Sequence, residues 1–251
     1  MLLLFDIGNT HTHLGWADRR RVVRHADLPT RTCLDESALP ALRKFVGRHR
    51  PAGVCLCSVV PRATPHVLHL ARRIADVPPL VLTPDTLVGV GINYPKPDTI
   101  GPDRLANAVA VRAHYGAPAV VVDFGTAVTF DVVDRQGRYV GGIIAPGLAA
   151  MTDYLHERTA LLPRIRIREI DSVIGKNTRE AMVIGAVHGY RGLIRELLTQ
   201  LRRQLGSRRL PVVATGGYAR LMAARLPEIT AVEPLLTLEG LRLVWTLQNG
   251  K

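Results

Sequence analysis

The sequence Leu3-Leu4-Phe5-Asp6-Ile7-Gly8-Asn9-Thr10 opens the chain and decides how the rest is interpreted. It has a counterpart in Val120-Val121-Val122-Asp123-Phe124-Gly125-Thr126-Ala127, 117 residues further on. In both copies an apolar, β-prone run ends at an aspartate, and a glycine follows two residues later. Another strand-like run comes next, at His13–Ala17 and at Val128–Val133. Each copy therefore predicts a β-hairpin with a carboxylate and a glycine at its bend.

Strand-like and helix-like segments alternate along the chain, which predicts an α/β protein. Each hairpin opens one half of the sequence, so we expect two similar lobes, 1–115 and 116–251, that face each other across a ligand cleft. Beyond the hairpins, strands are expected at Val54–Cys57, Leu80–Leu82 and Val212–Ala214, and helices at Leu39–Val46, Val67–Ala75, Arg104–His114 and Ala181–Leu205.

The composition is that of a globular protein, with 47% hydrophobic and 22% charged residues among 251. The apolar run Met1–Phe5 stops at Asp6, and no later stretch reaches the length of a membrane span, so we expect a cytoplasmic protein without a membrane partner. The three cysteines lack the spacing of a disulfide framework or a zinc site, and we expect reduced packing residues.

The net charge of +12 favours anionic partners but does not choose among them. Basic residues are spread over several short clusters, such as Arg19–Arg21, Arg72–Arg73 and Arg202–Arg203. Few aromatic residues are interleaved with them, and no known nucleic-acid module is present. We therefore expect a solvated basic surface and no nucleic-acid partner.

The two bends offer the groups that bind phosphate. A glycine lets the backbone approach a ligand, and neighbouring N–H groups with Asn or Thr side chains donate to phosphate oxygens, as in Gly8-Asn9-Thr10 and Gly125-Thr126. The preceding aspartate can hold a cation or a water molecule against those phosphates. Either bend alone is more typical of an ordinary Asx turn than of a functional site. Their recurrence at equivalent places in two halves favours a functional site.

Asp103 lies near the start of a predicted helix, after a segment rich in turn-forming residues. Two roles remain open from the local sequence: a helix N-cap, or a base that accepts the proton of an acceptor hydroxyl, as the catalytic aspartate of other kinases does. Arg104 is suited to an anionic substrate group, and Tyr94 to a hydroxyl contact or a packing wall.

Three other motifs carry little weight. Gly175-Lys176-Asn177-Thr178 looks like the end of a Walker A loop, but the asparagine and a missing first glycine break that pattern. Gly89-Val90-Gly91 lacks the third glycine of a dinucleotide fingerprint. His11 and His13 share one face of a strand, yet two imidazoles without a third ligand make a poor metal site.

Taken together and in order, these motifs resemble type III pantothenate kinase, a family related to the Bvg accessory factor within the acetate and sugar kinase/Hsp70/actin superfamily. The resemblance spans nearly the whole chain. It rests on both hairpin bends, Tyr94, Gly101-Pro102-Asp103-Arg104, Gly141-Gly142 with Pro146-Gly147, Gly175–Thr178 and Thr215-Gly216-Gly217. Pro102, where a small or aliphatic residue is expected, and Val128, where threonine is common, depart from the family pattern.

The resemblance implies a two-lobed actin-like ATPase (ribonuclease H-like) fold, each lobe a mixed β-sheet flanked by helices. It also implies ATP-dependent phosphorylation of pantothenate, the first committed step towards coenzyme A, with Mg²⁺ on ATP, a monovalent cation (K⁺ or NH₄⁺) and a homodimer. Asp103 would accept the proton and Asp123 would bind the monovalent cation. The implied ATP site is Asp6, Ile7, Gly8, Asn9, Thr10, His11, Thr12, His13 and Thr126, and the implied pantothenate contacts are Tyr94, Gly101, Pro102, Asp103, Arg104 and Thr178.

Two alternatives stay open at this point. The first is a kinase of the same superfamily that acts on another small alcohol. The second is a nucleotide-responsive regulator or nucleic-acid binder, which the basic charge and the accessory-factor name suggest. A panel of substrates distinguishes the first alternative from a pantothenate kinase. DNA binding that depends steeply on salt, without kinase turnover, would favour the second alternative.

Overall fold

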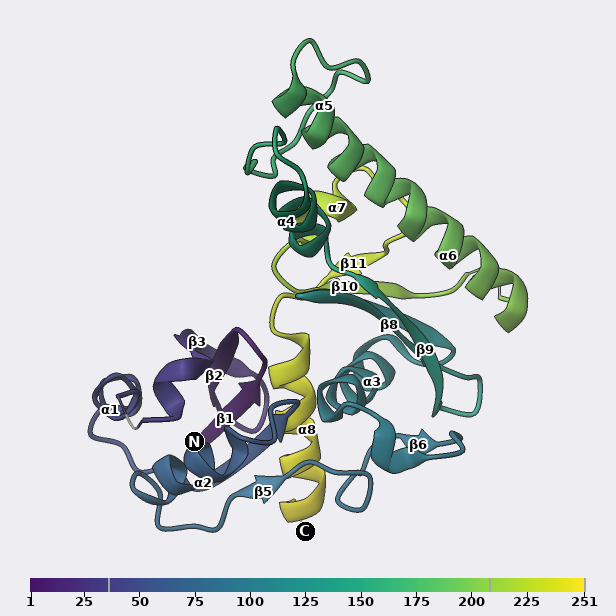
Figure 1. Ribbon diagram of the computed structural model, residues 1–251. Coiled ribbons are helices and arrows are strands. Elements are labelled where there is room, and N and C mark those ends of the chain that lie inside the picture. The colour runs from purple at the N-terminus through teal and green to yellow at the C-terminus, as the bar shows by residue number, and fades with distance from the viewer. Residues whose placement is uncertain (36, 208, 251) are drawn as a thin grey trace. The chain divides into compact units, whose positions relative to one another are not determined.

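The computed structural model describes residues 1–35, 37–207 and 209–250 (Figure 1). The chain divides into two compact units that do not follow a single cut in the sequence. Unit 1 comprises Met1–Gly116, Gly137–Val140 and Leu235–Lys251, and unit 2 comprises Ala117–Gln136 and Gly141–Pro234. This division differs from the predicted boundary at 115/116, because the chain returns to unit 1 twice after leaving it.

Unit 1 is built on a mixed five-stranded sheet in the order β3-β2-β1-β4-β5. Strand β1 pairs antiparallel with β2 and parallel with β4, so it lies at the centre and its apolar side chains are buried on both faces. The strands are β1 (Leu2–Ile7), β2 (His11–Ala17), β3 (Val22–Pro29), β4 (Gly53–Ser58) and β5 (Leu80–Val81).

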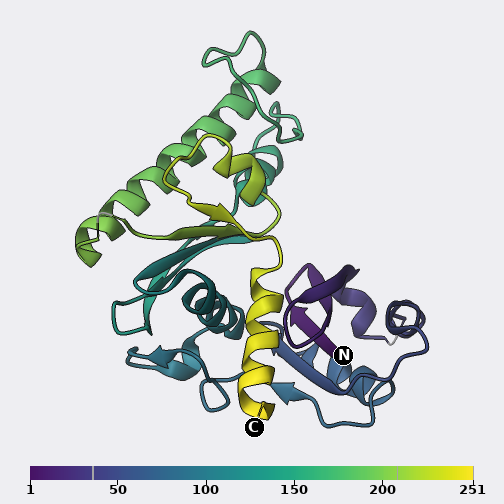
Figure 2. The same cartoon turned by 180° about the vertical axis from the view of Figure 1, so that it is seen from behind.

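Helices cover both faces of this sheet. A core cluster joins alternate residues of β1, such as Leu3 and Phe5, to the apolar sides of α1 (Leu39–Val46) and α2 (Thr64–Arg72). On the other face, the C-terminal helix α8 (Leu236–Asn249) contacts β1, β4 and α3 (Pro102–Tyr115), as both views show (Figures 1 and 2). The short elements of unit 1 are η1 (Thr30–Cys33), β6 (Gly91–Ile92), which pairs with Arg138 and Tyr139 of β9 (Arg138–Pro146), and η2 (Pro97–Thr99).

Close packing of α8 on α3 explains why the C-terminal segment belongs to unit 1. A Cβ atom at Gly240 of α8 would lie 2.0 Å from the carbonyl oxygen of Ala106 in α3, so only a glycine allows the two backbones to approach this closely. The predicted boundary did not include this return because helical periodicity does not indicate which sheet a helix covers.

Unit 2 repeats the strand arrangement of unit 1. Its strands follow the order β11-β10-β7-β8-β9, in which β7 pairs antiparallel with β8 and parallel with β10. The new elements are β7 (Ala119–Phe124), β8 (Ala127–Val133), β10 (Val212–Thr215), β11 (Ala231–Val232), α4 (Leu148–Arg158), α5 (Thr178–Ile184), a π-helical turn η3 (Gly185–Gly189), α6 (Tyr190–Leu205) and α7 (Ala219–Ala223). The order matches β5-β4-β1-β2-β3, so the internal similarity seen in the sequence is a repeat of topology.

The repeated topology places the two bends at equivalent positions. Asp6 lies at the end of β1 beside Cys57 of the parallel strand β4, and Asp123 lies at the end of β7 beside Thr215 of the parallel strand β10. The predicted helix Ala181–Leu205 is interrupted by the π-helical turn, and the predicted hairpins are both present.

Candidate active site

The first bend is held by hydrogen bonds to its own backbone and to Thr30. Gly8 N–H donates to the carbonyl of His11 at 3.0 Å, and the Thr30 hydroxyl donates to the carbonyl of Gly8 at 2.7 Å. The Thr12 and Thr30 hydroxyl oxygens are 3.0 Å apart in the buried interior. Asn9, Thr10 and His11 are exposed, whereas Ile7 and Thr12 have no exposed surface. Two of the predicted ATP contacts, Ile7 and Thr12, are therefore buried beneath the bend and support it by packing.

The two histidines of β2 lie side by side without forming a metal cluster. Their ring centroids are 6.4 Å apart, and Nδ1 of His13 is 2.7 Å from a carboxylate oxygen of Asp27 on β3. Within residues 1–35, 37–207 and 209–250 there is no group of three His, Cys, Asp or Glu side chains that could hold a metal ion.

Asp6 and Asp103 influence each other electrostatically within unit 1. Burial, and then the negative charge of Asp103, raise the pKa of Asp6 to about 6, while His13 and the Cys57 thiol partly oppose the shift. The Cys57 thiol donates to a carboxylate oxygen of Asp6 at 3.4 Å. Two aspartates that lie 97 positions apart in the sequence therefore share one site, a pairing that no local pattern predicts.

Asp103 is the second residue of α3, and it is not the N-cap. Gly101 occupies the N-cap position without a side-chain cap, and Pro102 is the first helical residue, where its missing N–H costs nothing. The Asp103 carboxylate accepts from the backbone N–H of Arg104 at 2.8 Å. Burial raises the pKa of Asp103, although this hydrogen bond and the Arg104 charge partly oppose that effect. The N-cap interpretation of Asp103 is thus wrong. The Asp103 carboxylate is more basic than that of an ordinary surface aspartate.

Tyr139 connects the predicted pantothenate contacts Tyr94 and Arg104. The ring centroids of Tyr94 and Tyr139 are 6.2 Å apart in an edge-on arrangement, and the guanidinium carbon of Arg104 lies 5.8 Å from the Tyr139 ring centroid. Tyr139 is buried at the start of β9, whereas Tyr94 is 39% exposed. No local motif pointed to Tyr139, because this residue reaches unit 1 only through the pairing of β9 with β6.

Two glycines pack against the second bend in unit 2. A Cβ atom at Gly216, whose φ is +86°, would lie 2.5 Å from a carboxylate oxygen of Asp123. One at Gly147 would lie 2.2 Å from the carbonyl oxygen of Thr126, and the Gly147 N–H donates to that oxygen at 3.2 Å. The half-buried carboxylate of Asp123 and the neighbouring Thr215 on β10 provide oxygen ligands of the kind that a monovalent cation requires.

Thr178 is the first residue of α5 and is exposed on unit 2. The Asn177 side chain caps this helix by accepting from the N–H of Glu180 at 3.0 Å, and the Lys176 N–H donates to the Glu180 carboxylate at 2.9 Å. The apparent Walker A ending therefore forms a helix N-cap.

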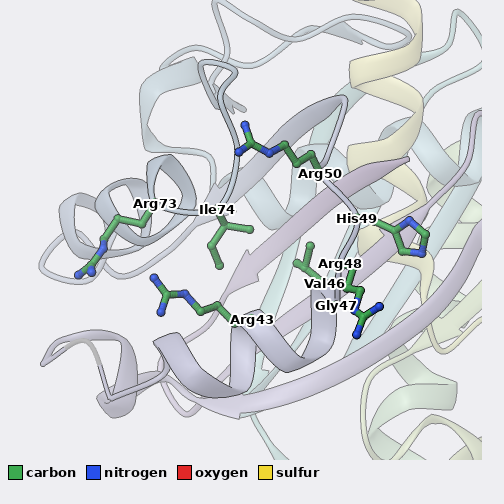
Figure 3. A pocket seen from close by; sticks show the side chains of 8 residues that line it. All are labelled: Arg43, Val46, Gly47, Arg48, His49, Arg50, Arg73 and Ile74. Carbon is green, nitrogen blue, oxygen red and sulfur yellow. The ribbon is translucent and has the colours of Figure 1, made fainter.

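The basic hollow in Figure 3 contains none of the predicted site residues. It lies in unit 1 between the ends of α1 and α2, with Arg43, Arg50 and Arg73 around the side chain of Ile74. Arg50 forms an ion pair with Asp76 beside it. The hollow belongs to the dispersed basic surface that the composition predicts, and it does not change the assignment of the site.

The cysteines match the expectation of reduced packing residues. Cys33, Cys55 and Cys57 are free and buried, and burial raises the pKa of Cys55 to about 12, so its thiol is unreactive. Across the described part of the chain, no helix combines the length and the apolar character that crossing a membrane would require.

Comparison with known proteins identifies the family. A family model for type III pantothenate kinase matches residues 2–200. A type III pantothenate kinase from Akkermansia muciniphila is 47% identical over 242 residues, 96% of this chain and 96% of that protein. Among solved structures, a Baf family protein from Campylobacter jejuni superposes with a TM-score of 0.61 at 18% identity, covering 99% of this chain and 100% of the other.

An inorganic polyphosphate/ATP-glucomannokinase from Arthrobacter has a TM-score of 0.51 at 15% identity, with 99% of each chain covered. At these identities the structural likeness shows the fold alone, and it confirms the predicted actin-like kinase architecture of two mixed sheets flanked by helices. The family match and the identity over nearly the full length go further: this chain belongs to the type III pantothenate kinase family.

Proposed function

We propose that the protein transfers the γ-phosphoryl group of ATP to the hydroxyl of pantothenate, giving 4′-phosphopantothenate for coenzyme A synthesis. Family membership supports the reaction, and one structural observation carries the assignment of its base: Asp103 is held at the start of α3, beside Asp6, with a raised pKa. A carboxylate of raised pKa is a better proton acceptor than an ordinary surface aspartate.

The residues around Asp103 suit the substrate. The Arg104 guanidinium, braced by the Tyr139 ring, can pair with the carboxylate of pantothenate, and the exposed edge of Tyr94 can line the same pocket. Gly101 leaves room for the Asp103 carboxylate, because a Cβ atom there would lie 2.5 Å from its oxygen. Pro102 fixes the backbone at the helix start, so this departure from the family pattern keeps Asp103 in place.

Phosphoryl transfer depends mainly on alignment and on neutralising charge. The exposed residues Asn9, Thr10 and His11 of the first bend can donate hydrogen bonds to phosphate oxygens, and Thr126 offers a hydroxyl at the second bend. We assign Asp123 to a monovalent cation, K⁺ or NH₄⁺, and Mg²⁺ to ATP itself. These ions would neutralise the phosphates during transfer.

We further propose that the protein is a cytoplasmic homodimer. Unit 2 exposes large apolar side chains on and near α4, including Ile144, Met151 and Leu155, which are 65%, 40% and 41% exposed. Clustered apolar exposure of this kind is typical of a protein interface. Thr178 is exposed in the same unit, so it can serve the partner subunit's pantothenate site. A Leu155→Glu change should shift the sedimenting species towards a monomer, and an unchanged dimer would argue against this surface.

A coupled assay tests the reaction. Turnover with pantothenate, ATP and Mg²⁺ should rise when K⁺ or NH₄⁺ is added, and a panel of sugars and other small hydroxy acids should give little turnover. A sugar substrate would favour the rival kinase. DNA binding that falls steeply with salt, without any turnover, would favour the regulatory alternative.

Replacement of the base gives a sharper test. Asp103→Asn should lower kcat by about two to four orders of magnitude while ATP still binds, because only the proton acceptor is lost. Asp76→Asn, which changes an exposed aspartate of unit 1, is the matched control and should keep normal turnover. Near-normal turnover in Asp103→Asn would remove Asp103 from its proposed role.

A further inference from the structure

Tyr190 is a buried tyrosine of unit 2 that contacts Phe124 of the second bend and also the backbone of Pro146. Its side chain is 1% exposed, and its ring centroid lies 6.5 Å from that of Phe124, the residue between Asp123 and Gly125. Its hydroxyl donates to the carbonyl of Pro146 at 3.0 Å. No sequence motif pointed to this residue, and nothing in the proposed reaction uses it directly.

The bond to Pro146 reaches the bend through one further residue. Gly147 follows Pro146, and its N–H donates to the carbonyl of Thr126 at 3.2 Å. The fit is tight, because a Cβ atom at Gly147 would lie 2.2 Å from that carbonyl and 2.7 Å from the carbonyl oxygen of Gly125. Any movement of the Pro146–Gly147 backbone must therefore move Thr126.

The two contacts close a ring of interactions around the bend. From Tyr190, one path runs through Phe124 to Gly125, and the other runs through Pro146 and Gly147 to Thr126. A single side chain thus fixes the bend relative to the end of β9 and the start of α4. Because interiors are close-packed, such a brace restricts both segments at once.

The π-helical turn just before Tyr190 sets the direction of its side chain. Gly185–Gly189 forms this turn between α5 and α6, and both views show the two helices running on as one rod (Figures 1 and 2). A π-helical turn holds about one residue more than an α-helical turn, which rotates the following residues by about 100°. Without it, Tyr190 would leave the face that meets Phe124 and Pro146. Such turns are costly and occur often at functional sites.

We propose that Tyr190 is a positioning residue that holds the Asp123–Thr126 bend in the geometry required for the ATP phosphates and the monovalent cation. This inference rests on the proposed function, because it assigns a task to that same bend. The Tyr190 hydroxyl does not contact a reacting group; it acts through Pro146 and Gly147. Its loss should therefore weaken ATP and cation binding and leave the pantothenate contacts, which lie mainly in unit 1, unchanged.

Tyr190→Phe is the direct test, because the ring stays and only the hydroxyl is lost. The dissociation constant for ATP and the K⁺ concentration for half-activation should each rise about three- to tenfold, the range for one net hydrogen bond. The KM for pantothenate at saturating ATP and K⁺ should stay within about twofold, since that measurement reports on unit 1. Tyr115→Phe, the same change at the end of α3, should leave the ATP dissociation constant as it is.

Gly147→Ala perturbs the same bend at Thr126, where Gly147 contacts it directly. Its added methyl group must push against the Thr126 carbonyl, so it should raise the same two constants by at least as much as Tyr190→Phe. A lower melting temperature of Tyr190→Phe with unchanged ATP and K⁺ constants would show a merely structural role and overturn the inference. Equal increases for ATP and pantothenate would overturn it as well.

The outcome is separable from that of the proposed function. ATP binding is measured by calorimetry and needs no turnover. If the wild-type protein does not phosphorylate pantothenate, the proposed function fails, while the comparison of ATP affinity between Tyr190→Phe and Tyr115→Phe still decides the role of Tyr190.

Discussion

Asp6→Asn should make the protein more stable at neutral pH. In the folded protein, burial and then the negative charge of Asp103 raise the pKa of Asp6 from 3.8 to about 6. At neutral pH the carboxylate is therefore held in its charged form at a cost, and this cost is offset only when a ligand supplies positive charge or hydrogen bonds. An asparagine has nearly the same shape and carries no charge, so it removes the cost.

The size of the effect follows from linkage between protonation and folding. A raised pKa means that the folded state binds more protons than the unfolded state between pH 3.8 and about 6, so stability falls as pH rises through that window. At 1.36 kcal/mol per pH unit, the difference between the two pKa values corresponds to up to about 3 kcal/mol. Asp6→Asn should gain this amount above pH 6 and nothing below about pH 4.

Urea unfolding of both proteins at pH 4, 5, 6 and 7.5, without ATP and with a chelator present, measures this difference. Asp18→Asn is the control of opposite sign, because two backbone N–H donors, from Arg21 and Arg20, lower the pKa of Asp18. That variant should be less stable than wild type at neutral pH, and the deficit should fade on acidification. The reasoning is refuted if Asp6→Asn shows no gain at pH 7.5, or the same gain at pH 4.

The remaining predictions concern neighbouring groups and close packing. A double-mutant cycle at pH 7.5 tests the coupling between Asp6 and Asp103. Asp6→Asn should stabilise the Asp103→Asn variant less than it stabilises wild type, because the negative charge of Asp103 is already gone. Additive changes in the free energy of unfolding would contradict this coupling. Gly240→Ala should lower the free energy of unfolding by about 1 to 3 kcal/mol, because the added methyl group clashes with Ala106. Gly192→Ala, at an exposed position of α6, should raise the free energy of unfolding by about 0.5 to 1 kcal/mol. Urea unfolding that shows the reverse order would disprove this packing. Gly216→Ala should raise the K⁺ concentration for half-activation about fivefold or more, because the added methyl group, at a residue of positive φ, clashes with the Asp123 carboxylate. An unchanged K⁺ concentration for half-activation would argue against the proposed cation site.

The central strands of the fold were predictable because they are buried on both faces. Leu2–Ile7 and Ala119–Phe124 are nearly continuous apolar runs that end in a polar turn, a pattern that periodicity detects well. Val22–Pro29 was missed because this edge strand exposes Arg24 and His25, and Arg24 interrupts the apolar alternation of Val22, Ala26 and Leu28. Helix α8 belongs to unit 1 because it contacts α3. A local sequence pattern cannot predict such a contact between distant segments.

The candidate site was predictable only where its residues follow one another along the chain. Both bends and the Asp103–Arg104 pair are local motifs, so the sequence displays them. Tyr139 and Tyr190 reach the site from elements that are distant in sequence, and each is recognised by the contact it makes in the fold. A signal for Tyr190 does exist in the two glycines Gly185 and Gly189, which frame the π-helical turn, but glycines within a helical pattern have many other causes.

The repeated topology also supports a division of tasks between the two aspartates. Each ends the central strand of its sheet, yet the parallel neighbour of Asp6 is Cys57 and that of Asp123 is Thr215. A thiol is a poor ligand for a hard cation, and burial together with the nearby Asp103 carboxylate raises the pKa of Asp6, whereas a hydroxyl adds an oxygen ligand beside Asp123. The bends alone are too similar to separate phosphate binding from cation binding. The adjacent parallel strand supplies the difference, so the proposal that Asp123 binds K⁺ rests on this neighbouring strand more than on the bend.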